Sequence, residues 1–289
     1  MNLLHRLLWV LVLFPWLDVF FRSYLPGFVS SLWDEMFIVV ILFFVWLYKR
    51  HESRALVIPT GIRWPFYAFL FFCVGSIVIH VVPLAVSIDA MRVVFQSMFF
   101  ILLTMYTLEE ERRVDQFMNL LIVSTVLISF YGMYEYAFKV ESTRWEHTKD
   151  KDNFRIISIM SNPNALAGYL NMMLAFTTAL VLFLKDKKLK LIYLVASLPI
   201  MVALMLTFSR GAWIAFVAMG IFYIWVWNKK WLLALPVLGA IAPFVMPAAV
   251  TSRFMKLFDK NYYKMSSEYG RISFWQEAID KIYENPISG

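Results

Sequence analysis

The stretch that decides the fold is residues 163–227, which read PNALAGYLNMMLAFTTALVLFLKDKKLKLIYLVASLPIMVALMLTFSRGAWIAFVAMGIFYIWVW. It contains three apolar blocks, and only the charged island at 185–190 and a short junction at Ser209-Arg210 separate them. An α-helix needs about 20 residues to cross the roughly 30 Å hydrocarbon core of a bilayer. Each block has about that length, so the stretch predicts three consecutive membrane-spanning helices.

The same pattern extends over most of the chain. Of 289 residues, 61% are hydrophobic and 16% are charged, whereas soluble domains carry about 25% charged residues. The apolar runs predict about nine spans, at 3–20, 32–48, 64–82, 86–107, 115–138, 163–184, 189–207, 210–227 and 231–247. The predicted fold is therefore all-α, a polytopic transmembrane helical bundle over residues 1–247. We expect residues 248–289 to be the start of a large extracytoplasmic loop, truncated at Gly289.

Basic residues are concentrated in short loops on one side of the predicted bundle. The formal net charge is +7, but the Lys and Arg residues lie between apolar blocks, which favours a membrane-facing role over nucleic-acid binding. Loops on the side of the amino terminus hold roughly twice as many of them as the short opposite loops. We therefore expect a cytoplasmic amino terminus, with segments 139–162 and 248–289 outside.

Several chemistries have no support in the sequence. It contains no glycine-rich phosphate loop, no dinucleotide fingerprint and no His-x-x-x-His pair, so no cofactor is predicted. The single cysteine, Cys73, cannot form a disulfide within one chain or a thiolate metal cluster. Asp150-x-Asp152 is a weak metal-binding signal in a loop expected to be external, so no metal site is predicted either.

Arg210 lies between two strongly apolar runs, directly before Gly211. An arginine at the centre of a membrane helix costs about 2.5–3.5 kcal/mol on insertion scales, so such residues usually face a cavity or a partner. Gly211 allows a ligand to approach closely, and a guanidinium at the start of a helix suits phosphate binding. The alternative is that Arg210 snorkels to the headgroups and only ends the loop.

Arg271 precedes apolar residues at helical spacing, among them Ile272, Trp275 and Ile279. This spacing predicts an amphipathic helix on the outer interface, with Arg271 near its amino-terminal end. The alternative is an ordinary solvated arginine.

The run Ser161-Asn162-Pro163-Asn164 opens the sixth predicted span. Asn162 suits a helix cap and Pro163 the first helical position, so capping alone is a sufficient account of the motif. Arg155, shortly before it, would add positive charge to the same outer mouth.

Ionisable residues also occur near earlier spans. Asp89 and Arg92 lie three apart and share a helix face, which predicts a buried pair that specifies packing; the alternative is a polar relay along a cavity. Asp34-Glu35 is expected to be a solvated helix start, with a catalytic base as the alternative.

Four motifs, in this order, resemble the O-antigen ligase-like family of polysaccharide ligases and polymerases. They are Asn-Pro-Asn-x-x-Ala at 162–167, Ser-Arg-Gly-Ala-Trp at 209–213, Gly-Arg-x-x-x-Trp-x-x-Ala at 270–278 and Asn-Pro-x-x-Gly at 285–289. All four lie on the side of the membrane that the charge pattern places outside.

The resemblance implies a glycosyltransferase on the outer face of the bacterial cytoplasmic membrane, acting without a metal. Its donor would be a glycan on undecaprenyl diphosphate and its acceptor a lipid-linked sugar or another glycan; ligase and polymerase both stay open. Arg210 and Arg271 match the family's two arginine positions and would be catalytic, stabilising the leaving diphosphate. The expected substrate-binding residues are Arg155, Asn162, Asn164, Ser209, Trp213 and Trp275.

The family's acceptor-activating histidine lies further along the external loop, and none of the histidines here matches it. We therefore expect residues 1–289 to be inactive alone. One rival is a transporter or flippase for lipid-linked glycans, which would require inverted repeats and broken helices. Two others are a protein glycosyltransferase with Asp34-Glu35 as its acidic centre and a purely structural membrane scaffold.

Overall fold

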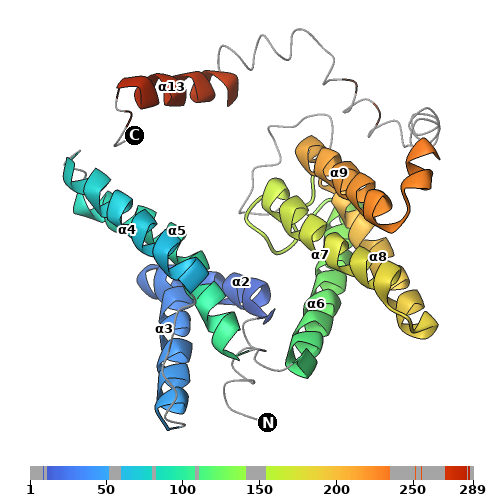
Figure 1. The fold of residues 1–289 in the computed structure, drawn as a ribbon, viewed down its shortest axis with the longest axis horizontal. Coiled ribbons are helices and arrows are strands. Elements are labelled where there is room, and N and C mark those ends of the chain that lie inside the picture. The colour runs from blue at the N-terminus through green and yellow to red at the C-terminus, as the bar shows by residue number, and fades with distance from the viewer. Residues whose placement is uncertain are drawn as a thin grey trace. The chain divides into compact units, whose positions relative to one another are not determined.

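The computed structural model describes residues 9, 12–51, 60–79, 83–107, 111–140, 154–234, 251, 255, 271–284 and 286. Every regular element within these residues is helical, which confirms the all-α prediction. The chain divides into two compact units. Unit 1 consists of Met1–Asp115 and Lys260–Gly289, and unit 2 of Gln116–Asp259. Figure 1 shows the helices of both units with their labels.

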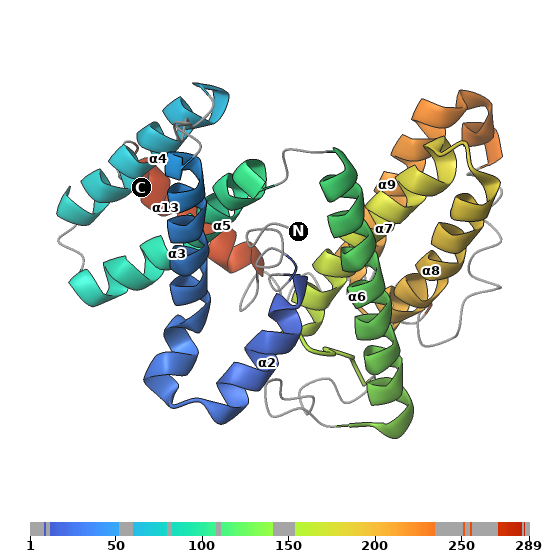
Figure 2. The ribbon, with the colours of Figure 1, turned by 90° about the horizontal axis from the view of Figure 1, so that it is seen from below.

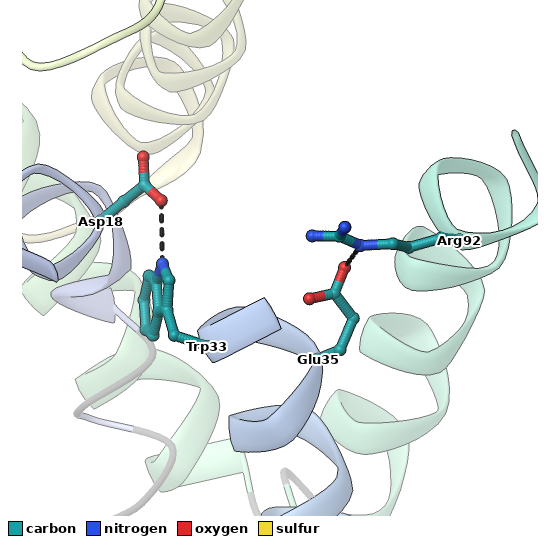
Figure 3. A network of polar contacts seen from close by, with 4 residues as sticks. All are labelled: Asp18, Trp33, Glu35 and Arg92. Carbon is teal, nitrogen blue, oxygen red and sulfur yellow. Dashed lines mark hydrogen bonds and ion pairs between the residues drawn. The ribbon is translucent and has the colours of Figure 1, made fainter. Parts of the chain in front are cut away.

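Unit 1 contains five described helices, α2 (Phe14–Tyr24), α3 (Gly27–His51), α4 (Thr60–Ile79), α5 (Leu84–Thr107) and α13 (Arg271–Glu284). Helices α2 and α3 form a hairpin, because Pro26 interrupts the chain between them (Figure 2). The indole Nε1 of Trp33 donates to Asp18 of α2 at 3.0 Å and ties the hairpin together (Figure 3). Further along α3, Ile41 and Val45 are buried and pack against partly buried side chains that include Phe100 of α5.

An ion pair links α3 to α5. The Nε of Arg92 donates to the carboxylate of Glu35, and both side chains are one-quarter exposed (Figure 3). This corrects the prediction that Arg92 forms a buried pair with Asp89, because Asp89 is exposed and Arg92 contacts the neighbouring helix instead. Helical spacing showed which residues share a face, but it could not reveal a partner 57 residues away.

Unit 2 contains α6 (Glu111–Phe138, which starts in unit 1), α7 (Pro163–Phe183), α8 (Lys187–Leu206), α9 (Arg210–Trp227) and the 3-10 helix η2 (Lys229–Ala234). Helices α7 and α8 are joined by three residues, and Asp186 caps α8 by accepting from two of its backbone N–H groups. Their packing buries apolar residues along both helices, namely Leu166, Leu170, Met173 and Leu174 of α7 and Ile200, Ala203 and Leu204 of α8.

Within the part of the chain that the structure describes, five helices are long and apolar enough to cross a membrane: Thr60–Ile79, Val114–Phe138, Pro163–Phe183, Lys187–Leu206 and Arg210–Trp227. Their bounds agree within a few residues with predicted spans, but the count of about nine is not confirmed. Within the predicted span 3–20, Trp9 and Val12 are helical, Leu13 forms a turn and α2 begins at Phe14, with Pro15 in its first turn, a position that proline favours; residues 3–8, 10 and 11 lie outside the described residues. The predicted span 231–247 begins in the 3-10 helix η2, and its residues 235–247 lie outside the described residues.

We predict that Arg92→Met lowers the stability of unit 1 by about 1–3 kcal/mol, because Glu35, which is only one-quarter exposed, then keeps its charge without this partner. The double variant Glu35→Met/Arg92→Met should regain most of that loss, since apolar side chains can replace a buried pair. Thermal unfolding in detergent measures both effects. If the double variant is as unstable as Arg92→Met, the loss of stability does not come from the unpaired charge of Glu35, and the prediction is wrong.

Leu170 is fully buried in α7, so Leu170→Ala should lower the free energy of unfolding by about 2–5 kcal/mol. Met172 lies two residues further along and is 49% exposed, so Met172→Ala is the matched control. Thermal unfolding of the purified protein would show a clear loss for the first variant and little change for the second. Equal effects would mean that α7 buries a different face.

Candidate functional site

Residues 154–162, which we call the strap, cross unit 2 between the end of α6 and the start of α7 as irregular backbone. Ile156 and Ile157 in the strap are fully buried. The backbone N–H of Ile156 donates to the carbonyl of Leu206, the last residue of α8, at 3.3 Å. The strap therefore lies against the elbow, residues 207–209, that joins α8 to α9.

The other side of the strap is bound to α6 through a buried carboxylate. Oε2 of Glu135 accepts the backbone N–H groups of Ile157 and Ser158, each at 2.8 Å. The Ser158 hydroxyl donates to the carbonyl of Ile128, also on α6, at 2.8 Å. Glu135 is 2% exposed. It was not among the predicted site residues, although a carboxylate inside an apolar span is a recognisable signal of a functional position.

Arg155 bridges the strap to both neighbouring elements. Its Nε donates to the carbonyl of Thr207 in the elbow at 2.9 Å, and its Nη2 donates to Oδ1 of Asn164 in the first turn of α7 at 3.1 Å. The hydroxyl of Ser209 donates to the same Asn164 oxygen at 3.0 Å. The structure therefore brings together three of the predicted substrate-binding residues, Arg155, Asn164 and Ser209.

Asn162 caps α7. Its Oδ1 accepts the backbone N–H groups of Asn164 at 3.0 Å and Ala165 at 2.9 Å, and Pro163 follows at the first helical position. This geometry is the one that the capping interpretation predicted. Asn162 thereby fixes the helix start that carries Asn164. Both asparagines therefore contribute to the polar region where the strap, the elbow and the first turn of α7 meet, which we call the corner of unit 2.

Arg210 is the first residue of α9, directly after Ser209 at the N-cap position, and its side chain is partly exposed. Trp213, one turn later, is 4% exposed. Its Nε1 donates to the carbonyl of Leu204 at 3.3 Å, and its ring packs edge-on against Phe208 of the elbow. These contacts give Trp213 a packing role at the α8–α9 junction, and its predicted contact with substrate stays a prediction.

The backbone around this corner is strained. Among the described residues, three residues other than glycine have positive φ: Lys139 at 53°, Ser158 at 52° and Phe208 at 49°. They lie at the end of α6, in the strap and in the elbow. Such conformations cost free energy and persist where the surroundings enforce them, often at functional sites.

A further cation stands at the same end of α6. The Nζ of Lys139 lies 3.8 Å from the centre of the Tyr136 ring and 5.0 Å from that of Phe154 in the strap. Tyr136 in turn packs against Phe208 of the elbow, with ring centres 6.4 Å apart. Lys139, Arg155 and Arg210 therefore border one corner of unit 2, where positive charge favours an anionic group.

Arg271 and Trp275 lie on α13, whose helical bounds confirm the predicted helix. Arg271 is its first residue, and Trp275 is 65% exposed. These residues belong to unit 1, whereas Arg210 belongs to unit 2. Among the described residues, no group of three His, Cys, Asp or Glu side chains is arranged to hold a metal ion.

Comparison with known protein families gives a match to the carboxyl-terminal third of the chain. The model described as O-Antigen ligase matches residues 194–289, which include most of α8, the elbow, α9 and α13. No curated protein and no solved structure matches the chain significantly. Three of the four motifs that carried the resemblance lie within the matched residues, and the match over this part of the chain supports the predicted family.

Asn162 offers a test of its structural role. Asn162→Ala should cost about 0.5–2 kcal/mol of stability, because two backbone N–H groups at the start of α7 lose their acceptor. Asn162→Asp should retain the cap and the stability. Thermal unfolding in detergent measures the difference. An Asn162→Ala protein that unfolds like the wild type but fails in glycan transfer would instead identify Asn162 as a direct contact to substrate.

Proposed function

We propose that this chain, whose residues 194–289 match the O-antigen ligase family, forms the glycan-transfer site of a membrane enzyme. The enzyme transfers a glycan from undecaprenyl diphosphate to a sugar acceptor, a lipid-linked sugar or a growing chain. The family and the apolar helices indicate an integral membrane protein of bacteria. The bias of Lys and Arg supports a site on the outer face of the cytoplasmic membrane, with a cytoplasmic amino terminus.

The observation that carries the proposal is the polar corner of unit 2. Arg155 and Ser209 both donate to Asn164, and Arg210 begins the next helix beside them. A membrane protein gains no stability from placing arginines between apolar segments unless they meet polar partners or an anionic ligand. The arrangement is suited to a lipid-linked phosphate, because its charges are already oriented by the strap and the elbow.

The chemistry requires a cationic site of this kind. The acceptor hydroxyl oxygen forms a bond to the anomeric carbon of the donor sugar, and the bond from that carbon to the diphosphate oxygen breaks. The diphosphate leaves with the electron pair, and the hydroxyl proton passes to a base. Oriented positive charge beside the departing oxygen lowers the barrier to this step.

The residues divide into three roles. Arg210 and Arg271 are the proposed catalytic residues and stabilise charge on the diphosphate. Arg155, Asn164 and Ser209 hold the donor near the elbow. Asn162 acts through its cap on α7, and Trp275 on the exposed surface of α13 is a candidate for contact with a sugar ring.

We predict that Arg210→Ala and Arg271→Ala each reduce glycan transfer by about 10²-fold or more, the scale seen when one charge-stabilising donor is removed. The assay uses the full-length gene in its deletion host, at matched membrane abundance. Lys187, an exposed cation at the other end of α8, provides the control Lys187→Ala, which should transfer normally.

The location of the accumulating precursor separates the alternatives. Lipid-linked precursor outside the membrane supports the transferase, whereas precursor inside would identify a transporter. Normal transfer by both arginine variants would mean that these residues are topological anchors and that the site assignment is wrong. Loss of transfer in Asp34→Asn, with activity retained in both arginine variants, would favour an acidic centre instead.

The same glycans distinguish ligase from polymerase. If the variants leave long polymer on its lipid carrier and none on the final acceptor, the enzyme is a ligase. If single repeat units accumulate and long chains disappear, it is a polymerase.

A further inference from the structure

Glu135 is a buried ionisable residue to which the proposed reaction assigns no role. It lies one turn before the end of α6 and is 2% exposed, within a helix apolar enough to span a membrane. A carboxylate at such a position is costly unless hydrogen bonds satisfy it. Both described bonds, from the N–H groups of Ile157 and Ser158, end on the single oxygen Oε2.

These two bonds determine where the strap lies. They attach residues 157 and 158 to α6, while the N–H of Ile156 is bound to α8 at Leu206. Ser158 adopts φ 52°, and its hydroxyl is bound to Ile128 on α6. The chain is thus fixed on two sides within three residues, directly after Arg155.

The position of Arg155 therefore depends on the attachment of the strap residues that follow it, as well as on the hydrogen bonds of its own side chain. Its guanidinium reaches the carbonyl of Thr207 and the amide oxygen of Asn164 only when the strap lies between α6 and the elbow. Asn164 also accepts from Ser209, the residue before Arg210. A displacement of the strap would therefore disturb the corner that presents these polar groups.

We propose that Glu135 is a positioning residue for glycan transfer: its carboxylate docks the strap on α6, and the docked strap places Arg155 against Asn164 and the elbow for a lipid-linked phosphate. The role of the phosphate rests on the proposed function, whereas the docking of the strap does not. Glu135 itself contacts no substrate. It acts as a hydrogen-bond acceptor, and its effect reaches the donor through Arg155.

Removing the acceptor leaves two backbone N–H groups without a partner in a region of low dielectric, so the strap must move to satisfy them. Displacements of about 1 Å in residues that orient a substrate can lower a rate by about 10²-fold. Glu135→Ala should therefore reduce kcat/KM for the lipid-linked donor by about that factor. Glu135→Gln should stay within a few-fold of the wild type, because its amide oxygen can accept both N–H groups.

Docking of the strap can be measured without any assay of activity. Ile159 in the strap is 6% exposed, so Ile159→Cys in a cysteine-free full-length protein should react slowly with a membrane-impermeant maleimide. We expect labelling to be at least about 10-fold faster when Glu135→Ala is added and unchanged with Glu135→Gln. Ser129→Ala is the matched control, since Ser129 is fully buried on the same helix and its hydroxyl donates to the carbonyl of Thr125 within that helix.

Transfer kinetics at varied donor concentration complete the test. The proposal requires that Glu135→Ala raises KM for the donor and speeds labelling, while Glu135→Gln rescues both and Ser129→Ala changes neither. If Glu135→Ala does not reach the membrane, Glu135→Asp, which withdraws the carboxylate by one methylene, should show faster labelling and a raised KM. Wild-type behaviour of that variant would overturn the proposal.

Two other outcomes are also decisive. Glu135→Gln behaving like Glu135→Ala would show that the negative charge matters beyond docking, and the positioning role would be wrong. Unchanged labelling in Glu135→Ala, with transfer abolished by Arg210→Ala, would overturn the positioning role while leaving the proposed function intact. Faster labelling in Glu135→Ala, with normal transfer by Arg210→Ala and Arg271→Ala, would overturn the proposed arginine site for the phosphate and leave the docking of the strap intact.

Discussion

The need to satisfy backbone polar groups at the ends of membrane helices governs the structure of unit 2. Within a bilayer, irregular backbone is tolerated only where protein or enclosed water supplies its hydrogen bonds. The strap and the elbow are two such segments, and each receives its bonds from a charged side chain. Glu135 accepts two N–H groups of the strap, and Arg155 donates to the carbonyl of Thr207 in the elbow. The rest of the corner, including the cap of α7 and the packing of Trp213, is arranged around these bonds.

The distribution of charge follows from the same constraint. The carboxylate of Glu135 is buried beneath the strap, whereas the cations Lys139 and Arg210 stand at the ends of their helices and are exposed to different degrees. The ammonium group of Lys139 lies over the ring of Tyr136, which carries no net charge. This contact does not neutralise the lysine, so its positive charge can still attract an anion. In the corner, hydrogen bonds thus satisfy the buried polar groups, and the surface carries positive charge. This arrangement suits phosphate, because the side chains need little rearrangement to bind it.

Helices α6 to α9 were predictable from the sequence because each is a continuous apolar block bounded by local signals. The cap at Asn162 is of the same kind, since donor and acceptor lie within three residues of one another. Contacts between distant residues were not predictable. Glu135 meets Ile157 across 22 residues and Arg92 meets Glu35 across 57, and no spacing rule connects such pairs. The catalytic roles of Arg210 and Arg271 stay predictions, because the matched family and the helix bounds do not test them.

The order of the residues along the chain gives the strap a consequence for biogenesis. Arg155 emerges from the ribosome 52 residues before Thr207, which at 5–20 residues per second is a delay of about 3–10 s. Glu135, in contrast, has already been made when the strap appears. All the contacts that bind the strap to α6 are therefore complete in the chain before the elbow has been made, so the strap can dock on α6 before α8 and α9 are added. The order of synthesis thus allows the corner to assemble in one direction along the chain, from α6 through the strap to the elbow.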